Sequence, residues 1–158
     1  MDGNGHGTHV SGTTGSNTYG VAKKTNIIGV KVLSSEGSGT NAQVLAGIDW
    51  AVNDMKSKGR VGKSVANLSL GGIFSPMTNA AAAEAVAQGL FMAVAAGNSG
   101  LPTITSSPAS ERSVCTVGAT DKDDNRASFS NFGLLVDIFA PGKQHGSLQI
   151  LLTTLTIL

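Results

Sequence analysis

The chain has 158 residues and a formal net charge of +1, with 41% hydrophobic and only 13% charged residues. Disordered chains combine low hydrophobicity with high net charge, so this composition excludes disorder of that kind. Eleven Lys and Arg residues stand against ten Asp and Glu residues, which leaves no basic excess for a nucleic-acid partner. The length suits one domain with one hydrophobic core.

Three further classes are disfavoured by what the sequence lacks. The single cysteine, Cys115, cannot form an internal disulfide. No run of residues reaches the ~20 apolar residues that span a bilayer, so no membrane partner is expected. Met1 is followed at once by Asp2, Gly3 and Asn4, so we expect no signal peptide at this start.

The first half of the chain predicts a buried strand followed by an amphipathic helix. Residues 25–33 form a short, β-branched run that is typical of a buried strand. The polar, glycine-rich residues 34–40 predict a loop. Apolar side chains then recur at three- and four-residue spacing on one face of a helix from about Asn41 to Lys58, and Gly59 fits its end.

The second half continues the alternation of strands and helices. Residues 64–70 predict a strand that is closed by Gly71 and Gly72. Thr78 or Asn79 is expected to cap a helix that runs through Gln88. Gly89 fits the C-terminal end of this helix. Further strands are expected at 90–96, 113–119 and 135–139.

This order of elements predicts an α/β fold built on a parallel sheet. Strands that alternate with helices pair in parallel through right-handed crossovers. Strands that are apolar almost throughout predict helices on both faces of the sheet. Ligands of such sheets bind beyond the carboxyl ends of the strands, where loops rich in small residues are expected at 37–39, 69–72 and 96–98.

The glycine-rich segment from Gly3 to Gly12 has several interpretations. A dinucleotide-binding loop is excluded because Thr8 stands where that pattern needs glycine. A metal site could use His6 and His9, but no third ligand follows at the usual spacing. The segment could also be a turn into a helix with incidental histidines. Finally, His6 could be a general base, since glycines let a substrate backbone approach an imidazole that titrates near neutral pH.

Two other segments are ambiguous by themselves. Asn98 follows a predicted buried strand, so its amide could donate to a developing oxyanion or could simply stabilise its own turn. Residues 67–72 could pair with an extended peptide or could be no more than a strand and its turn. For each segment alone, the simpler structural interpretation is favoured.

Taken together, a series of motifs resembles the subtilisin-like serine proteases, and among them the proteinase K-like group. The resemblance covers roughly residues 2–142. The motifs that carry it are Asp2–His9, Tyr19–Thr25, Gly29–Leu33, Leu68–Gly72, Val94–Asn98, Ser107–Glu111, Val114–Ala119, Phe129–Asn131 and Asp137–Gly142.

The resemblance implies a subtilisin-like fold and a serine endopeptidase that hydrolyses peptide bonds. His6 would take the proton of a serine hydroxyl and later give it to the leaving amine. Asn98 would be the side-chain donor of the oxyanion hole. The pocket for the side chain before the cleaved bond would have two small, uncharged walls, which favours aliphatic or aromatic side chains. The implied binding residues are Gly37, Ser38 and Gly39 for the substrate backbone, and Ser69, Leu70, Gly71, Ala95, Ala96 and Gly97 for the pocket.

The chemistry requires no cofactor, but the resemblance implies a structural calcium ion. Its ligands would be the backbone carbonyls of Arg112 and Val114 and the carboxylate of Asp137, with waters completing the shell. Otherwise Asp137 would cap a turn. The expected partners are extended peptides or proteins, the expected state is a monomer, and full-length relatives are expected to be secreted.

The chain departs from the family pattern at both ends. The family's catalytic aspartate precedes its histidine on an earlier strand, yet only five residues precede His6. The Gly-Thr-Ser-Met-Ala segment that carries the family's nucleophile does not occur in the chain. We therefore predict an incomplete peptidase domain at 1–142 that is inactive alone. The alternative is a non-catalytic peptide- or calcium-binding domain.

The pattern also ends abruptly after Gly142. Residues 143–158 are predicted to be a divergent tail. Its last part, residues 148–158, is uncharged, mostly apolar and free of proline, which is typical of an aggregation-prone strand.

Overall fold

The computed structural model describes residues 2–142 and 154–157. Within these residues, no helix is long and apolar enough to cross a membrane. The elements, in chain order, are α1 (His6–Gly15), β1 (Ile28–Val30), α2 (Asn41–Ser57), β2 (Val65–Ser69), β3 (Gly72–Ile73), α3 (Pro76–Ala87), β4 (Phe91–Ala95), a 3₁₀ helix (Thr103–Thr105), β5 (Ser106–Ser107), β6 (Cys115–Thr120), β7 (Ile138–Pro141) and β8 (Thr154–Ile157).

The main sheet has six strands in the order β1-β8-β2-β4-β6-β7. The pairs β2–β4, β4–β6 and β6–β7 are parallel. Strand β8 is antiparallel to both β1 and β2, so β1 and β2 run in the same direction. The predicted α/β fold with a parallel sheet is therefore confirmed, and β8 is its one reversed strand among the described residues.

Strand β8 comes from the tail that the sequence marks as strand-like. Thr154 lies opposite Ser69 of β2, and Ile157 lies opposite both Ile28 of β1 and Ala66 of β2. The rest of the predicted segment, residues 148–153 and 158, lies outside the described residues.

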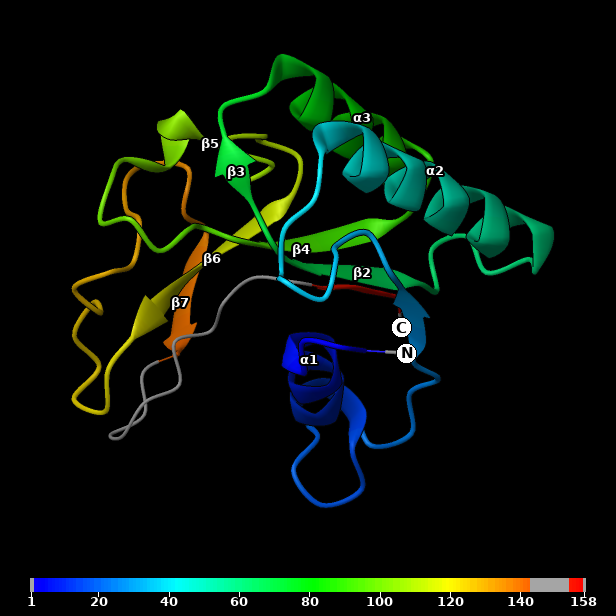
Figure 1. Ribbon diagram of the computed structural model, residues 1–158, viewed down its shortest axis with the longest axis horizontal. Helices are drawn as coiled ribbons and strands as arrows, with labels where there is room; N and C mark the ends of the chain where they lie inside the picture. The colour runs from blue at the N-terminus through cyan, green and yellow to red at the C-terminus, as the bar shows by residue number, and fades with distance from the viewer. Residues whose placement is uncertain (1, 143–153, 158) are drawn as a thin grey trace.

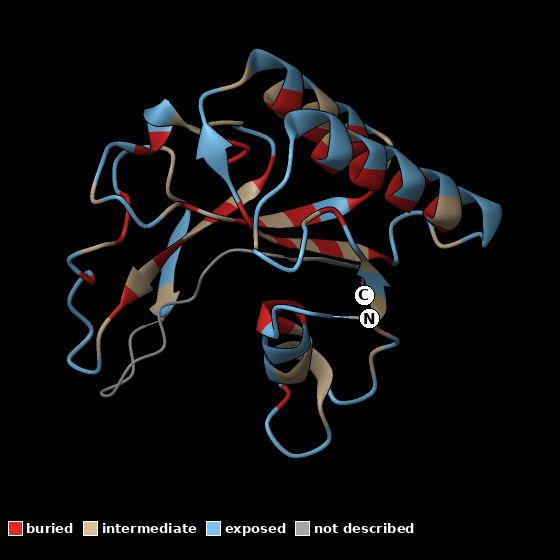
Figure 2. Ribbon diagram, in the orientation of Figure 1, coloured by how far each residue is buried: buried red, intermediate tan, exposed pale blue. Residues whose placement is uncertain are grey.

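Helices cover the sheet on both faces, as expected. Helices α2 and α3 lie side by side on one face, and α1 lies on the other face (Figure 1). The hydrophobic core fills the space between the sheet and α2 and α3, where the inner sides of the helices are buried (Figure 2). Each valine, leucine, isoleucine or methionine side chain that is fully buried there stabilises the fold by roughly 1.5–3 kcal/mol. The core includes Ile48, Ala51, Val52, Met55, Ala66, Leu68, Ala82, Ala85, Met92 and Val94.

The two faces of the sheet are not buried equally. In β2, β4 and β6, buried residues alternate with half-buried or exposed ones. Leu68 and Val94 face the core, so Ser69, Ala93 and Ala95 face the side on which α1 lies. The face on which α1 lies is therefore less completely buried than the face that packs against α2 and α3.

Helix α2 matches its prediction, whereas α3 begins earlier than expected. The hydroxyl of Thr40 accepts a hydrogen bond from Gln43 N, and the Gln43 side chain accepts one from Thr40 N, which forms a capping box. Helix α3 begins at Pro76 because the hydroxyl of Ser75 accepts a hydrogen bond from Thr78 N. Proline at the first helical position is favourable, so Thr78 lies inside the helix instead of capping it.

Two predicted strands are displaced or shortened. The run at 25–33 forms a strand only at Ile28–Val30. The strand expected at 135–139 lies at Ile138–Pro141, because Val136 N donates to Gly133 O and closes a turn before it. The small sheet of β3 and β5 was not expected from the sequence.

Candidate active site

The start of α1 holds His6 in a fixed position. Gly5 precedes the helix with a left-handed φ of 90°, which glycine adopts at little cost. The carboxylate of Asp2 accepts hydrogen bonds from Gly5 N at 2.9 Å and from Thr8 N at 2.8 Å. A hydrogen bond from the Thr8 hydroxyl, together with these two backbone bonds, lowers the pKa of Asp2 well below its usual range, so the group is an anion at neutral pH. Sequence reasoning did not assign this capping role to Asp2.

His6 is only 8% exposed. Burial lowers the pKa of the His6 imidazole by penalising its charged form, and the nearby His9 lowers that pKa further. The negative charge of Asp2 acts in the opposite direction. The neutral imidazole therefore dominates at neutral pH, and this is the form that can accept a proton as a general base.

The segment just before His6 lies beside the turn at 34–39. The side-chain amide of Asn4 donates a hydrogen bond to Ser35 O at 3.0 Å. Ser34 N donates to Ser38 O at 2.8 Å, and Gly37 has a φ of 80°, which closes the turn. Three residues are expected to pair with a substrate backbone: Gly37, Ser38 and Gly39. They thus lie in a segment that is hydrogen-bonded to the residues just before His6.

Asn98 lies in a hollow at the carboxyl ends of the parallel strands. This cavity has a volume of about 210 Å³. Of the predicted site residues, the structure brings together Ser69, Ala95, Ala96, Gly97 and Asn98 along its wall. Leu70 is buried and Gly71 is exposed, and neither residue lines this cavity.

The Asn98 cavity opens on the side of the sheet that carries α1. Ser69, Ala93 and Ala95 line it, and these residues alternate along their strands with the core-facing Leu68 and with Val94, which contributes to both the core and the lining. Helix α1 lies on that same face (Figure 1). His6 and Asn98 therefore belong to one side of the sheet, which a joint role in catalysis requires.

The residues proposed for calcium lie near the start of β6. The carboxylate of Asp137 accepts a hydrogen bond from Thr116 N at 2.7 Å, and Asp137 N donates to Thr116 O at 2.9 Å. The negative charge of Asp137 also contributes, after burial, to a raised pKa of the Cys115 thiol. Asp137 is thus bound to Thr116, which lies two residues after Val114. One carboxylate and two carbonyls make an all-oxygen donor set of the kind calcium prefers, provided that waters complete it.

The alternative metal site at His6 and His9 lacks further ligands. Across residues 2–142 and 154–157, no group of three or more His, Cys, Asp or Glu side chains is placed to hold a metal ion. Two histidines alone do not make up the three protein ligands of a typical catalytic zinc site.

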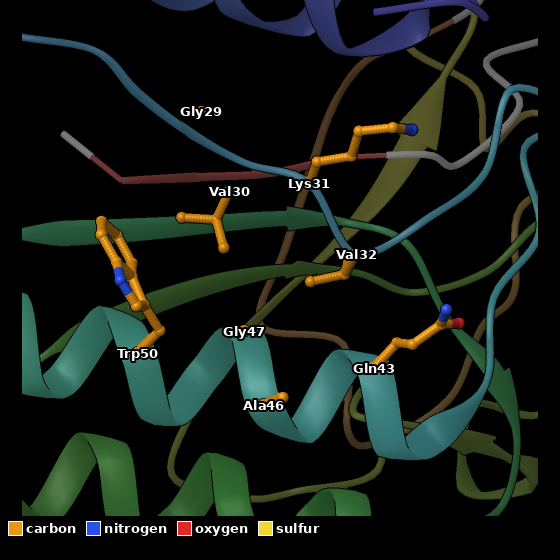
Figure 3. A pocket seen from close by; sticks show the side chains of 8 residues that line it. All are labelled: Gly29, Val30, Lys31, Val32, Gln43, Ala46, Gly47 and Trp50. Atoms are coloured by element: carbon orange, nitrogen blue, oxygen red, sulfur yellow. The ribbon is translucent and has the colours of Figure 1, made fainter. Parts of the chain in front are cut away.

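A second hollow lies between β1 and α2 and contains none of the predicted site residues. Its volume is about 440 Å³. Val30 and Val32 point toward α2, the ring of Trp50 reaches up from that helix, and Lys31 points away from it (Figure 3). Lys31 is its only titratable side chain, and this amine donates to Leu33 O. The hollow therefore offers no constellation for acid–base or nucleophilic chemistry.

Comparison with known proteins decides the family. The model of the subtilase family, Peptidase_S8, matches residues 1–157. The chain belongs to the subtilase family. The match spans the His6 segment and strand β4 with the following Asn98, which agrees with the resemblance of the sequence motifs.

Curated subtilases and a solved structure are similar to this chain. "Subtilisin-like serine protease Pen ch 13" of Penicillium rubens is 56% identical over 142 residues, which are 90% of this chain and 36% of the relative. "Subtilisin-like protease 7" of Arthroderma otae is 55% identical over 157 residues, covering 96% of this chain and 39% of the relative. The crystal structure of a cold-adapted subtilisin-like serine proteinase aligns with a TM-score of 0.86 at 49% identity, covering 91% of this chain and 51% of that one.

The chain spans less than two fifths of the length of these curated subtilases. The subtilisin-like fold that the sequence predicts is confirmed by the solved structure. Residues 143–153 lie outside the described residues, so a domain boundary at residue 142 stays a prediction. The roles of the individual site residues also stay predictions.

Proposed function

We propose that this chain is the part of a subtilisin-like serine endopeptidase domain that supplies the general base and the oxyanion donor. The observation that carries the proposal is the placement of His6 and Asn98 on one side of the sheet, with Asn98 in a cavity at the strand ends. His6 lies at the start of the glycine-rich helix α1, within the segment that the subtilase model matches, and this position supports its role as the base.

The proposed chemistry gives each residue of the site a separate task. The neutral imidazole of His6 takes the proton of a serine hydroxyl as that oxygen attacks the peptide carbonyl, and later returns it to the leaving amine. The side-chain N–H of Asn98 donates to the carbonyl oxygen as it becomes negative. The exposed backbone of Ser38 and Gly39 pairs with the extended substrate.

The walls of the cavity suit uncharged substrate side chains. Ser69, Ala95, Ala96 and Gly97 are small, and no charged side chain lines this cavity. An aliphatic or aromatic group gains from leaving water there, whereas a charged group would lose hydration without a partner. We therefore expect cleavage after aliphatic or aromatic residues.

Calcium would have a structural role in this proposal. The carbonyls of Arg112 and Val114 and the carboxylate of Asp137 would hold it near the start of β6. A bound cation there would offset the negative charge of Asp137 and tie the segment before β7 to β6. It would take no part in bond cleavage.

The chain alone is proposed to be inactive, because neither an upstream aspartate segment nor a Gly-Thr-Ser-Met-Ala segment is present. The test incubates the full chain with a chromogenic peptide and a fluorophosphonate, with a complete subtilase as the positive control. We expect neither turnover nor covalent labelling. Turnover that is lost in the His6→Ala variant would show that the chain is an enzyme by itself.

The site assignment is tested in a chimera. Residues 2–142 replace the matching segment of a complete subtilisin-like relative, whose other segments supply the missing serine and aspartate. In an active chimera, we expect Asn98→Ala to lower kcat about 10²–10³-fold. His6→Ala should abolish turnover, and Asn26→Ala, a change at an exposed asparagine outside the site, should leave it unchanged. An Asn98→Ala chimera with full kcat would remove the oxyanion assignment.

A further inference from the structure

The motif Phe129–Asn131 has no role in the chemistry proposed above, yet its asparagine is among the most buried polar residues described. Asn131 is 1% exposed. A carboxamide that is removed from water is costly unless its donors and acceptors are satisfied. The partners of this side chain therefore show what it holds in place.

All the hydrogen-bonding capacity of the Asn131 carboxamide is directed at the segment 96–106. Its Nδ2 donates to Ala96 O at 2.9 Å and to Ser106 Oγ at 3.2 Å. Its Oδ1 accepts from Ser99 N and from Leu101 N, both at 3.0 Å. These four bonds match the two donors and two acceptor sites that a carboxamide offers.

Hydrogen bonds of the Asn131 backbone and of Ser130 add further links. Asn131 N donates to Gly97 O at 2.9 Å. The hydroxyl of Ser130 accepts from Ala119 N at 2.9 Å and donates to Asn131 O at 3.0 Å. Because Ala119 belongs to β6, Asn131 connects the loop after β4 to a neighbouring strand of the same sheet.

The loop closes so tightly on Asn131 that only glycine fits at position 97. Gly97 has a φ of 107°, which side chains rarely adopt. A Cβ built on Gly97 would also lie 2.3 Å from Nδ2 of Asn131. The loop therefore bonds directly to Asn131 through Ala96, Gly97, Ser99 and Leu101, on both sides of Asn98.

We propose that Asn131 is the positioning residue for the oxyanion donor, because its carboxamide fixes the loop on which Asn98 stands. The inference rests on the proposed role of Asn98. Asn98 itself is exposed, so burial of its own side chain does not fix its backbone. A donor to an oxyanion must be held within about 0.5 Å of its productive place. Asn131 supplies that constraint from inside the protein without touching the substrate.

The experiment measures the order of the loop backbone directly and does not depend on catalytic activity. Amide hydrogen exchange and backbone chemical shifts of the full 158-residue chain are measured by NMR for the unchanged protein, Asn131→Ala and Asn131→Asp. We expect Asn131→Ala to speed exchange at Ser99 and Leu101 at least tenfold more than at Val94 in the core. The matched control is Asn79→Ala, which removes another partly buried amide whose bond goes to Ser110.

Asn131→Asp provides a signature that loss of stability alone does not produce. Its acceptor oxygen keeps the bonds from Ser99 N and Leu101 N, but its ionised carboxylate faces Ala96 O. Protonation restores an O–H donor to that carbonyl. The shifts of Gly97 and Asn98 should therefore return toward those of the unchanged protein as the pH falls. If Asn131→Ala does not fold, this titration still tests the proposal.

Two results would overturn the positioning role. The first is exchange at Ser99 and Leu101 that rises no more than exchange at Val94 in Asn131→Ala. The second is a set of Asn131→Asp loop shifts that do not depend on pH. Either result leaves the oxyanion role of Asn98 to the chimera experiment, so the two proposals fail separately.

Discussion

The carboxylate of Asp2 accepts two hydrogen bonds from Thr8, one from the backbone N–H at 2.8 Å and one from the hydroxyl at 2.7 Å. These bonds cap the first turn of α1, which begins at His6. A negative charge at this end also interacts favourably with the helix dipole. An exposed aspartate thereby controls both the position and the electrostatic surroundings of the proposed base.

Replacing Asp2 with alanine is expected to loosen the first turn of α1 and to lower the pKa of His6 further. The carboxylate raises that pKa by attracting the imidazolium, so its removal leaves burial and His9 unopposed. NMR titration of the His6 ring measures the shift, and amide exchange at Thr8 measures the loss of the cap. Asp2→Asn is the matched control, because it keeps an acceptor oxygen but removes the charge. An unchanged His6 titration in both variants would show that Asp2 only caps the helix.

Stability is expected to fall as the pH drops below neutrality, in part because of His6. The pKa of this group is lowered in the folded state from its ordinary value of 6.5, so the unfolded chain binds the proton more readily. The contribution of His6 to the free energy of unfolding therefore decreases as the pH falls through 6.5 and stops decreasing below the folded pKa of this group. Denaturant melts between pH 8 and pH 5 measure this slope for the unchanged chain and for His6→Gln. The variant should show a shallower slope, and equal slopes would contradict the prediction.

The sequence predicts the elements whose signals are local. Helix α2 shows its apolar face and ends before Gly59, and its observed bounds agree with the prediction. Strands β2 and β4 are short apolar runs followed by small residues, and both lie within a residue of their expected ends. In each case the deciding signal lies in residues that neighbour one another in the chain.

Features that depend on long-range contacts were not predictable. Nothing near Asn131 in the sequence indicates that its carboxamide bonds to Ser99 and Leu101, some thirty residues earlier. The insertion of β8 between β1 and β2 is likewise set by pairing between distant segments. The role of Asp2 carried a usable local signal, an acidic residue six positions before a threonine in the first helical turn. Gly5, not Asp2, occupies the usual capping position, so the common N-cap pattern does not indicate the role of Asp2.

Calcium is expected to stabilise the chain through Asp137. A ligand that binds only the folded state raises Tm as its concentration exceeds its Kd. Thermal melts with calcium or with a chelator should therefore differ, and Asp137→Asn should remove most of that difference. The matched control is Asp123→Asn, since Asp123 is exposed and pairs only with the neighbouring Lys122 among the contacts described. Equal melts of the unchanged chain in calcium and in chelator would rule out a calcium site at this position.

Gly97→Ala is expected to destabilise the chain more than Gly59→Ala, a substitution that costs only backbone strain. Gly97 and Gly59 both have positive φ, at 107° and 62°. Alanine in a left-handed conformation costs about 1–2 kcal/mol at either position. At Gly59 a Cβ meets nothing within 4 Å, whereas at Gly97 it meets the buried carboxamide of Asn131 at 2.3 Å. That overlap adds about 1–3 kcal/mol of crowding. Denaturant melts of the two variants measure the difference.

A double mutant tests the cause of the added cost. Because that cost comes from Asn131, Gly97→Ala should destabilise the Asn131→Gly variant less than it destabilises the unchanged chain. Purely additive losses of stability would show that the two residues do not interact.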